Sequence, residues 1–183
     1  HDHVGNDRGA ETHPHLGYNF RISELNAAVG IAQLRKIDSI LEMQEANYRK
    51  MREAISGIEG VSFRRVPKGG VENYSFLNFF LPTVELAQKA HESLLKHGVD
   101  GSFYWYSNNW HYIRGWEHLR ELKSLNRLPS EVRSQMQNLD KVDFSKSDHW
   151  MGRTVSCLVK VGWSNEEIQQ RATNMRLALE EVL

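Results

Sequence analysis

The segment between residues 23 and 56 constrains the fold most, because it is the longest stretch in which apolar residues recur at helical spacing. It reads SELNAAVGIAQLRKIDSILEMQEANYRKMREAIS. Ser23 is a favoured N-cap residue, since its hydroxyl accepts a bond from a free N–H group of the first turn. Gly57 and Gly60 follow the segment and favour its termination. We predict two helices, or one bent helix, whose small residues near the start let another backbone pack closely.

The second half of the chain changes to a strand-like composition. VSFRRV and YSFLNFFL are rich in aromatic and β-branched residues and predict two strands joined across PKGG. TVELAQKAHESLLKHG predicts a helix that Thr83 caps and Gly98 ends. VDGSFYW and TVSCLVKV predict two more strands, and SNEEIQQRATNMRLALEEVL a closing helix that begins with a capping box. Residues 104–145 are predicted to be irregular, with one short helix at 116–125. This order predicts a compact α+β sheet with helices on one face.

Composition excludes several classes of protein. The 183 residues suffice for one ordinary domain or two small ones, and 23 Lys+Arg cancel 23 Asp+Glu, so no basic field favours nucleic acid. No apolar run is long enough to span a bilayer, and the polar first residues do not resemble a signal peptide. The single cysteine, Cys157, excludes an internal disulfide, fits a reducing compartment and is predicted to be core. We expect a cytoplasmic protein with no membrane partner.

The opening HDHVGNDRGAETHPHLGYNFR contains four histidines, His1, His3, His13 and His15. Zinc sites need three or four ligands, but no cysteine or H-E-x-x-H helix completes a known spacing here. We predict no metal site. Two alternatives remain, solvated loop histidines or an approach to GYNFR, where an asparagine, an arginine and a helix start suit an anion such as phosphate.

The segment GYNFRISELNAAVGIAQLRKID resembles the signature of the DegT/StrS family of sugar aminotransferases, which carry pyridoxal phosphate (PLP) on a fold-type-I scaffold. That signature is G-[YF]-N-x-R-[ML] followed by a small-residue helix, AA-x-G-x-x-Q-L. The matching residues are Gly17, Asn19, Arg21, Ala27, Ala28, Gly30, Gln33 and Leu34. HGVDGSFYW, WHYI and MGRTVSCLVKVGWSNEEI resemble later segments of the family.

The resemblance implies an α/β fold that is the C-terminal part of a fold-type-I PLP aminotransferase. Residues 1–56 correspond to the end of the large domain, with an active-site loop and connecting helices. Residues 57–183 correspond to the small α+β domain. In the family the lysine that binds PLP lies further upstream of the motif than the residues present here, so no catalytic residue is expected in this chain. That lysine, the aspartate on the pyridinium nitrogen and the stacking aromatic are expected in a missing N-terminal half.

The resemblance also assigns site residues. Asn19 corresponds to the residue that donates to the PLP phosphate of the neighbouring subunit in a homodimer with shared active sites. Its alternative is a turn-forming asparagine. Arg21 is expected to bind a substrate carboxylate or lie at the interface, with a surface ion pair as the alternative. Arg8, His13 and His15 are expected contacts of an anionic sugar acid.

His111 and Tyr112 match a small-domain loop near the sugar site of the family. The alternative is a packed aromatic cluster formed with Trp105, Tyr106, Trp110 and Trp116.

The HDHVGNDRGAE lead-in and the SCLVKVGWS ending narrow the resemblance to enzymes that aminate an eight-carbon keto sugar acid, 3,8-dideoxy-8-oxo-manno-octulosonate, with glutamate as donor, in lipopolysaccharide biosynthesis. Two alternatives stay open. One is amination of a nucleotide-linked keto sugar. The other is a non-catalytic α+β module that binds a sugar through its aromatic loop at 103–116.

Overall fold

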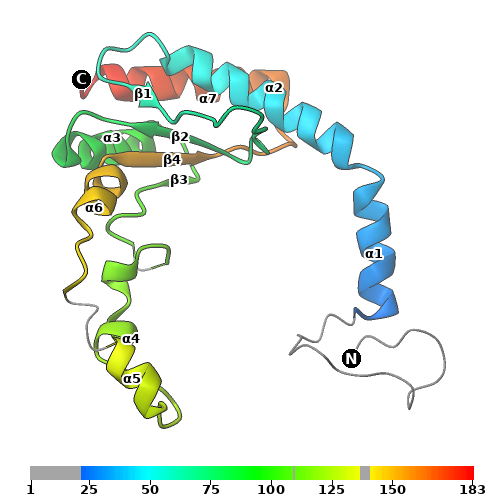
Figure 1. Cartoon of the computed structure of the whole chain (residues 1–183). Coiled ribbons are helices and arrows are strands. Elements are labelled where there is room, and N and C mark those ends of the chain that lie inside the picture. Colours follow the sequence, from blue (N-terminus) through cyan, green and yellow to red (C-terminus); the bar gives the residue numbers. More distant parts are fainter. Residues whose placement is uncertain (1–21, 109, 137–140) are drawn as a thin grey trace. The chain divides into compact units, whose positions relative to one another are not determined.

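The computed structural model describes residues 22–108, 110–136 and 141–183. Contacts divide the chain into two units, residues 1–39 and 40–183, which are described separately. In the first unit, helix α1 spans Glu24–Leu34 (Figure 1). Its predicted cap is confirmed, because the Ser23 hydroxyl accepts from the Asn26 backbone N–H at 3.3 Å. No residue of α1 is buried, and the Leu25 side chain is 76% exposed.

Helix α2 spans Ile37–Ile55, so the predicted helical region forms two helices. Its inward residues Tyr48, Met51 and Ile55 recur at helical spacing and are buried. The unit boundary falls within α2, after residue 39, whereas the sequence predicts a domain boundary after residue 56. The second half of α2 packs with the core of residues 40–183, and the domain boundary of the whole protein stays a prediction.

Four strands form one antiparallel sheet in the order β1-β2-β4-β3. Their bounds are Ser62–Phe63 for β1, Phe76–Phe80 for β2, Ser102–Phe103 for β3 and Thr154–Leu158 for β4. All four predicted strands exist, but β1 and β3 are much shorter than their patterns suggested. The central pair, β2 and β4, aligns Leu77 with Cys157 and Phe79 with Val155.

Because successive residues of a strand point to opposite faces, the sheet has two different surfaces. Leu77, Phe79, Val155 and Cys157 form the fully buried face. The predicted core position of Cys157 is therefore confirmed. The alternate residues of β2, such as Phe76 and Phe80, belong to the other face and are half-buried.

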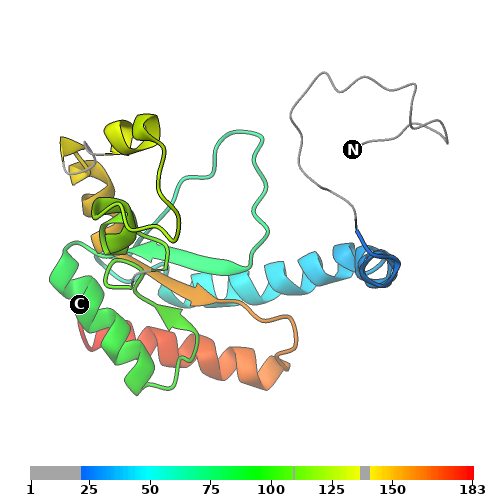
Figure 2. The same cartoon turned by 90° about the horizontal axis from the view of Figure 1, so that it is seen from below.

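Helices α2, α3 (Val84–Lys96) and α7 (Asn165–Glu180) cover the buried face. Seen from below, the strands lie in front of α2 and α7 (Figure 2). The predicted caps of α3 and α7 are confirmed. Thr83 accepts from the Leu86 backbone N–H at 3.2 Å, and Ser164 and Glu167 form a reciprocal capping box. Gly98 ends α3 with φ +74°, a conformation that glycine adopts readily.

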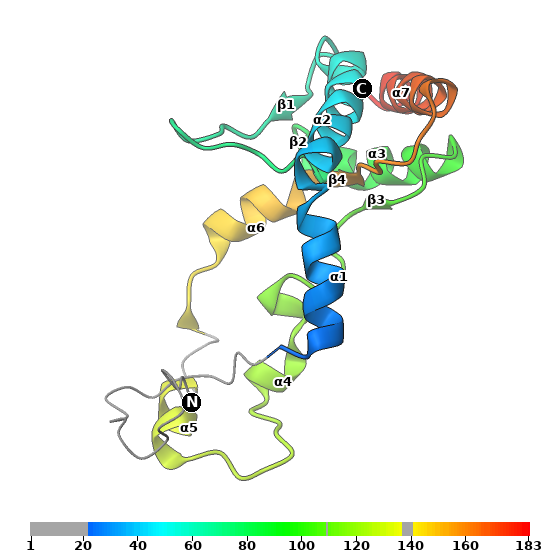
Figure 3. The same cartoon turned by 90° about the vertical axis from the view of Figure 1, so that its right-hand side faces the viewer.

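The long connection between β3 and β4 is more helical than predicted. It contains the 3₁₀ turn η1 (Ile113–Gly115) and the short helices α4 (Glu117–Arg120), α5 (Ser130–Met136) and α6 (Ser145–Gly152), seen in Figure 3. The helix expected at 116–125 is α4, which is shorter. Helices α5 and α6 were not predicted, because neither is long enough to display a clear apolar period. Within the described ranges no helix is long and apolar enough to cross a membrane.

Helix α6 is tied closely to the sheet and to α3 at Gly152. The Tyr104 hydroxyl donates to the Gly152 carbonyl at 2.8 Å. A Cβ atom added at Gly152 would lie 2.9 Å from Val84 Cγ2, closer than real side chains allow. The end of α6 therefore requires the absence of a side chain.

We predict that Gly152→Ala lowers the free energy of unfolding by ~1–3 kcal/mol, because the added methyl group overpacks the junction with Val84. Gly162→Ala is the matched control, since no atom lies within 4 Å of its added Cβ atom. That control is expected to change stability by less than about 1 kcal/mol. Denaturant unfolding of the two variants measures the difference, and equal stabilities would contradict the packing argument.

Candidate functional site

Most of the predicted site residues lie outside the described residues. This holds for Asn19, Arg21, Arg8, His13 and His15, and also for His1 and His3 of the opening loop. Their roles stay predictions. Among the residues that the structure describes, no group of three or more histidine, cysteine and carboxylate side chains is placed to hold a metal ion.

His111 is described, and it lies at the edge of an aromatic cluster. We define this cluster as Phe76, Phe103, Trp105, Trp110 and His111. The Phe103 and Trp105 rings stack with centroids 4.6 Å apart and an interplanar angle of 7°. The His111 ring meets Trp105 edge-on at 4.6 Å. Phe76 lies behind them, 6.4 Å from Trp105.

The aromatic cluster extends from the sheet face that α2, α3 and α7 leave uncovered. Phe76 on β2 and Phe103 on β3 belong to that face, because their neighbours Leu77 and Ser102 point to the buried one. Trp110 is 66% exposed, so the cluster offers ring surface to solvent. Exposed aromatic rings suit the apolar face of a sugar ring or of a nucleobase.

Tyr112 points the opposite way from His111 and belongs to a different group of rings. It is buried and lies 5.6 Å from Tyr106, whose ring lies 6.2 Å from Tyr104. Trp116 pairs with His118 at 6.2 Å. The aromatic packing considered as an alternative is therefore confirmed in part, because His111 packs against Trp105 and Trp110 and Tyr112 packs against Tyr106, in two groups of rings.

Asp148 on α6 holds the loop that carries these rings. Its carboxylate accepts from the Tyr112 hydroxyl and, at 2.7 and 2.6 Å, from the Arg114 Nε and Nη2 groups. Hydrogen bonds from Arg114 and Tyr112 lower the pKa of Asp148, and the bond to Asp148 raises that of Arg114. Burial is the largest cause that raises the pKa of Tyr112 to about 12, and the hydrogen bond to Asp148 is the next. The carboxylate therefore stays charged and the phenol stays protonated at neutral pH.

A polar pair occupies the middle of the uncovered sheet face. Ser156 on β4 donates from its hydroxyl to Asn78 Oδ1 on β2 at 2.6 Å. The two residues are opposite each other in the register. Neither residue was predicted to belong to a site. The sequence signal that could have indicated them is a polar residue between two apolar residues of each strand.

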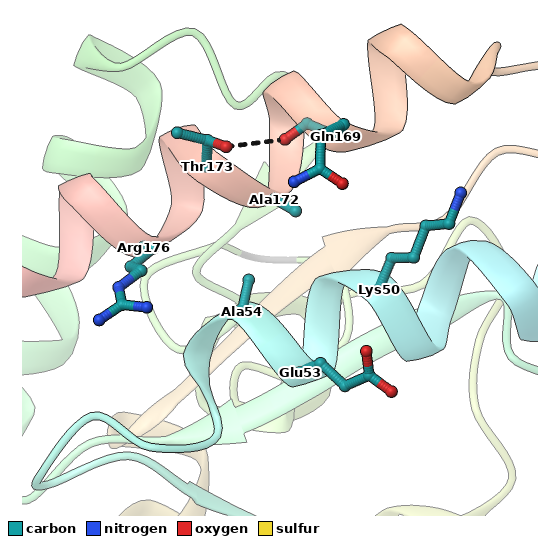
Figure 4. Close-up of a pocket in the computed structure, with 7 residues that line it drawn as sticks. All are labelled: Lys50, Glu53, Ala54, Gln169, Ala172, Thr173 and Arg176. Carbon is teal, nitrogen blue, oxygen red and sulfur yellow. Dashed lines mark hydrogen bonds between the residues drawn. The ribbon is translucent and has the colours of Figure 1, made fainter.

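A groove lies between α2 and α7, and its lining residues can be compared with those that PLP requires (Figure 4). It has a volume of about 370 Å³ and is lined by Lys50, Glu53, Ala54, Gln169, Ala172, Thr173 and Arg176. The Lys50 amine is bound to Asn165 Oδ1 at 3.0 Å, and Arg176 pairs with Glu180 at 2.7 Å. The charged side chains diverge in Figure 4, and no aromatic ring lines the groove. Since PLP requires a reactive lysine with partners for ring and phosphate, this groove does not fit it.

His91 on α3 and Ser102 on β3 form a serine–histidine pair next to Cys157, the single cysteine of the sequence. His91 Nδ1 and Ser102 Oγ are 3.1 Å apart, and Cys157 is adjacent in the register. Burial raises the pKa of the Cys157 thiol to about 11, the opposite of what a nucleophilic thiol requires. Ser102 is also buried, so this group is part of the core.

The fold of this chain is similar to that of solved aminotransferases. The chain resembles a solved aminotransferase from Psychrobacter cryohalolentis with a TM-score of 0.63 and 19% identity, covering 99% of this chain and 44% of that one. The fold is thus part of an α/β aminotransferase fold. Residues 2–176 match the sequence profile of the DegT/DnrJ/EryC1/StrS aminotransferase family. The chain belongs to this family of PLP-dependent enzymes.

Two curated relatives match shorter segments. A dTDP-4-dehydro-2,6-dideoxy-D-glucose 3-dehydratase from Saccharopolyspora spinosa is 38% identical over 50 residues, 27% of this chain and 11% of that protein. The lipopolysaccharide biosynthesis protein RfbH of Salmonella typhimurium is 36% identical over 44 residues, 24% of this chain and 10% of that protein. These matches span about a tenth of either relative.

We predict that Cys157 does not react with iodoacetamide at pH 8 in the folded protein. With a pKa of about 11, about one thiol in a thousand is ionised at that pH, and the side chain is fully buried. Mass spectrometry measures the labelling. The same reaction in guanidinium chloride is the control and is expected to go to completion, whereas rapid labelling of the native protein would contradict the core assignment.

Proposed function

We propose that this chain is the C-terminal part of a PLP-dependent aminotransferase that moves an amino group from glutamate to a keto or aldehyde sugar in sugar biosynthesis. The observation that carries the proposal is the family match over residues 2–176 of the 183. The reaction leaves the donor as its 2-oxo acid and the acceptor as an amino sugar. Bound PLP supplies the electron sink that such a transfer needs.

In this proposal the reactive lysine comes from the N-terminal half of the protein, together with the groups that hold the cofactor ring. The groove between α2 and α7 offers no substitute, because none of its lining residues is an aromatic ring that could stack on the cofactor. The surface of α1 supports a larger assembly. Leu25, Val29, Ile31 and Leu34 are all exposed on this one helix, an apolar surface that a covering partner would remove from water.

The segment before α1 completes the active site of a second subunit in this proposal. Asn19 donates its amide to the PLP phosphate of the neighbouring subunit in a homodimer. Arg21 binds a substrate carboxylate through its two parallel N–H groups. Arg8, His13 and His15 add positive or hydrogen-bonding groups for an anionic substrate.

His111 and the aromatic cluster form the small-domain wall of the sugar site. The exposed ring of Trp110 and the edge-on His111 offer an apolar surface with a hydrogen-bonding nitrogen beside it. That combination suits a sugar ring, whose faces are apolar and whose rim carries hydroxyl groups.

We propose 3,8-dideoxy-8-oxo-manno-octulosonate, an eight-carbon sugar acid of lipopolysaccharide, as the acceptor. Arg8, Arg21 and the histidines of the opening loop offer hydrogen-bond donors and potential positive charge, which supports a carboxylate substrate. The similarity to a protein of lipopolysaccharide biosynthesis supports the same pathway class. A nucleotide-linked keto sugar is the second candidate, because the other relative is named for a dTDP-linked sugar.

We predict that the 183-residue chain alone forms no borohydride-stable adduct with PLP, whereas the complete polypeptide forms one on a single upstream lysine. The physical reason is that the groove beside Lys50 has no aromatic ring to stack on the cofactor and fix it there. Reduction followed by peptide mass spectrometry measures the adduct. A stoichiometric adduct on one lysine of the isolated chain would contradict the proposed division. Its absence from the complete polypeptide would favour a non-catalytic sugar-binding module.

We predict that the complete enzyme, given glutamate and PLP, turns over the 8-oxo sugar acid in preference to nucleotide-linked 3-keto and 4-keto sugars. Arg21→Lys is expected to lower kcat/KM for the sugar acid by about 10-fold, since a point charge cannot reproduce a bidentate contact. Its PLP affinity, measured by titration, is expected to stay within about twofold because the substituted group faces substrate. Turnover of the nucleotide sugars alone would contradict the proposed sugar-acid acceptor and would leave the proposed aminotransferase reaction standing.

A further inference from the structure

We propose that Asp148 is a positioning residue: from α6 it holds residues 110–114 in the conformation that presents Trp110 and His111 to the substrate. The inference rests on the proposed function, in which the aromatic cluster borders the sugar site. It adds a specificity role for a residue that contacts no part of that cluster itself. Three observations carry it.

The first is the convergence of donors on one carboxylate. The Tyr112 hydroxyl and the Arg114 Nε group both donate to Asp148 Oδ1, and Arg114 Nη2 donates to Oδ2 at 2.6 Å. These donors are 36 and 34 residues away from Asp148 in sequence. Arg114 also lies over the Phe144 ring at 5.2 Å, just before α6 begins. The loop is thus fixed to α6 by both a buried phenol and a bidentate ion pair.

The second is that α6 is itself fixed to the sheet. Its last residue, Gly152, accepts from the Tyr104 hydroxyl at 2.8 Å and leaves no room for a Cβ atom beside Val84. Arg153, which follows, donates from Nε to the Leu81 carbonyl at 2.7 Å. The carboxylate of Asp148 therefore projects from a support anchored to β2, α3 and β3, so its position is determined by the core.

The third is the backbone conformation of the loop. Tyr112 is extended, with φ −128° and ψ 123°, and adjacent residues of an extended chain point to opposite sides. Holding Tyr112 inward by its hydroxyl therefore turns His111 outward, against the edge of Trp105. Trp110 is held next to it, its backbone N–H donating to Asn108 Oδ1 at 2.7 Å. Release of Tyr112 and Arg114 would free both rings to reorient.

A structural ion pair is the competing interpretation. The Arg114 side chain is 50% exposed and that of Asp148 24% exposed. Half-exposed pairs of this kind contribute little to global stability. Loss of the carboxylate is therefore expected to alter the loop and the substrate affinity far more than the fold. A combination of near-native unfolding and weakened substrate binding separates the two interpretations.

The experiment compares Asp148→Asn with Glu131→Gln, a matched loss of charge on the exposed helix α5, in the complete enzyme. For Asp148→Asn we expect KM for the sugar acceptor to rise at least fivefold with kcat changed by less than about twofold. We also expect increased acrylamide quenching of tryptophan fluorescence, because Trp105 and Trp110 lose their fixed packing. Glu131→Gln is expected to change neither quantity. Tyr112→Phe removes only the hydroxyl and is expected to reproduce part of both effects, which keeps the test valid if Asp148→Asn does not fold.

His111→Ala separates failure of this inference from failure of the proposed function. If His111→Ala raises the KM for the acceptor and Asp148→Asn leaves it unchanged, the positioning role of Asp148 is overturned. The proposal that His111 borders the sugar site then still stands. Unchanged tryptophan quenching in both Asp148→Asn and Tyr112→Phe would also overturn it, whatever the activity. If the complete enzyme transfers no amino group, the proposed function fails, whereas the quenching comparison still decides whether Asp148 holds the loop.

Discussion

The pairing of β2 with β4 is the contact on which the rest of residues 40–183 depends. These strands are far apart in sequence, and their register sets the faces of the sheet. With Leu77 opposite Cys157 and Phe79 opposite Val155, the central strands present an apolar face that receives α2, α3 and α7. A slip of one residue in β2 would place Asn78 against those helices instead, away from the Ser156 hydroxyl and among apolar side chains.

Local rules explain which elements could be predicted from sequence. The caps at Ser23, Thr83 and Ser164 act within one turn, so a short window contains all their partners. Strand length is different, because β1 and β3 are edge strands that end where the central strands stop offering partners. The β-branched and aromatic residues of VSFRRV and VDGSFYW, such as Val66 and Trp105, continue past those ends. Helices α5 and α6 are short, and α6 is stabilised by contacts with distant residues such as Tyr104.

The same distinction applies to the candidate site. His111 was identified through a family resemblance, and its role stays a proposal. Asp148 was not identified, because its importance comes from Tyr112 and Arg114, more than thirty residues earlier, and no local pattern links them. The division of the aromatic residues could not be predicted from a strand pattern, because Trp105 and Tyr106 lie in a turn after β3.

A one-sided sheet allows residues 40–183 to combine a stable core with the proposed substrate surface. The covered face supplies the stability, through side chains such as Met51 and Met175 that have no exposed surface. The uncovered face can then carry Phe76, Phe103 and the Asn78–Ser156 pair without loss of the core. Because the loop that adds Trp110 and His111 is fixed at Asp148, changes within that loop alter the surface offered to a ligand while the core stays intact. Variation of a loop on a constant scaffold is how one fold serves different substrates.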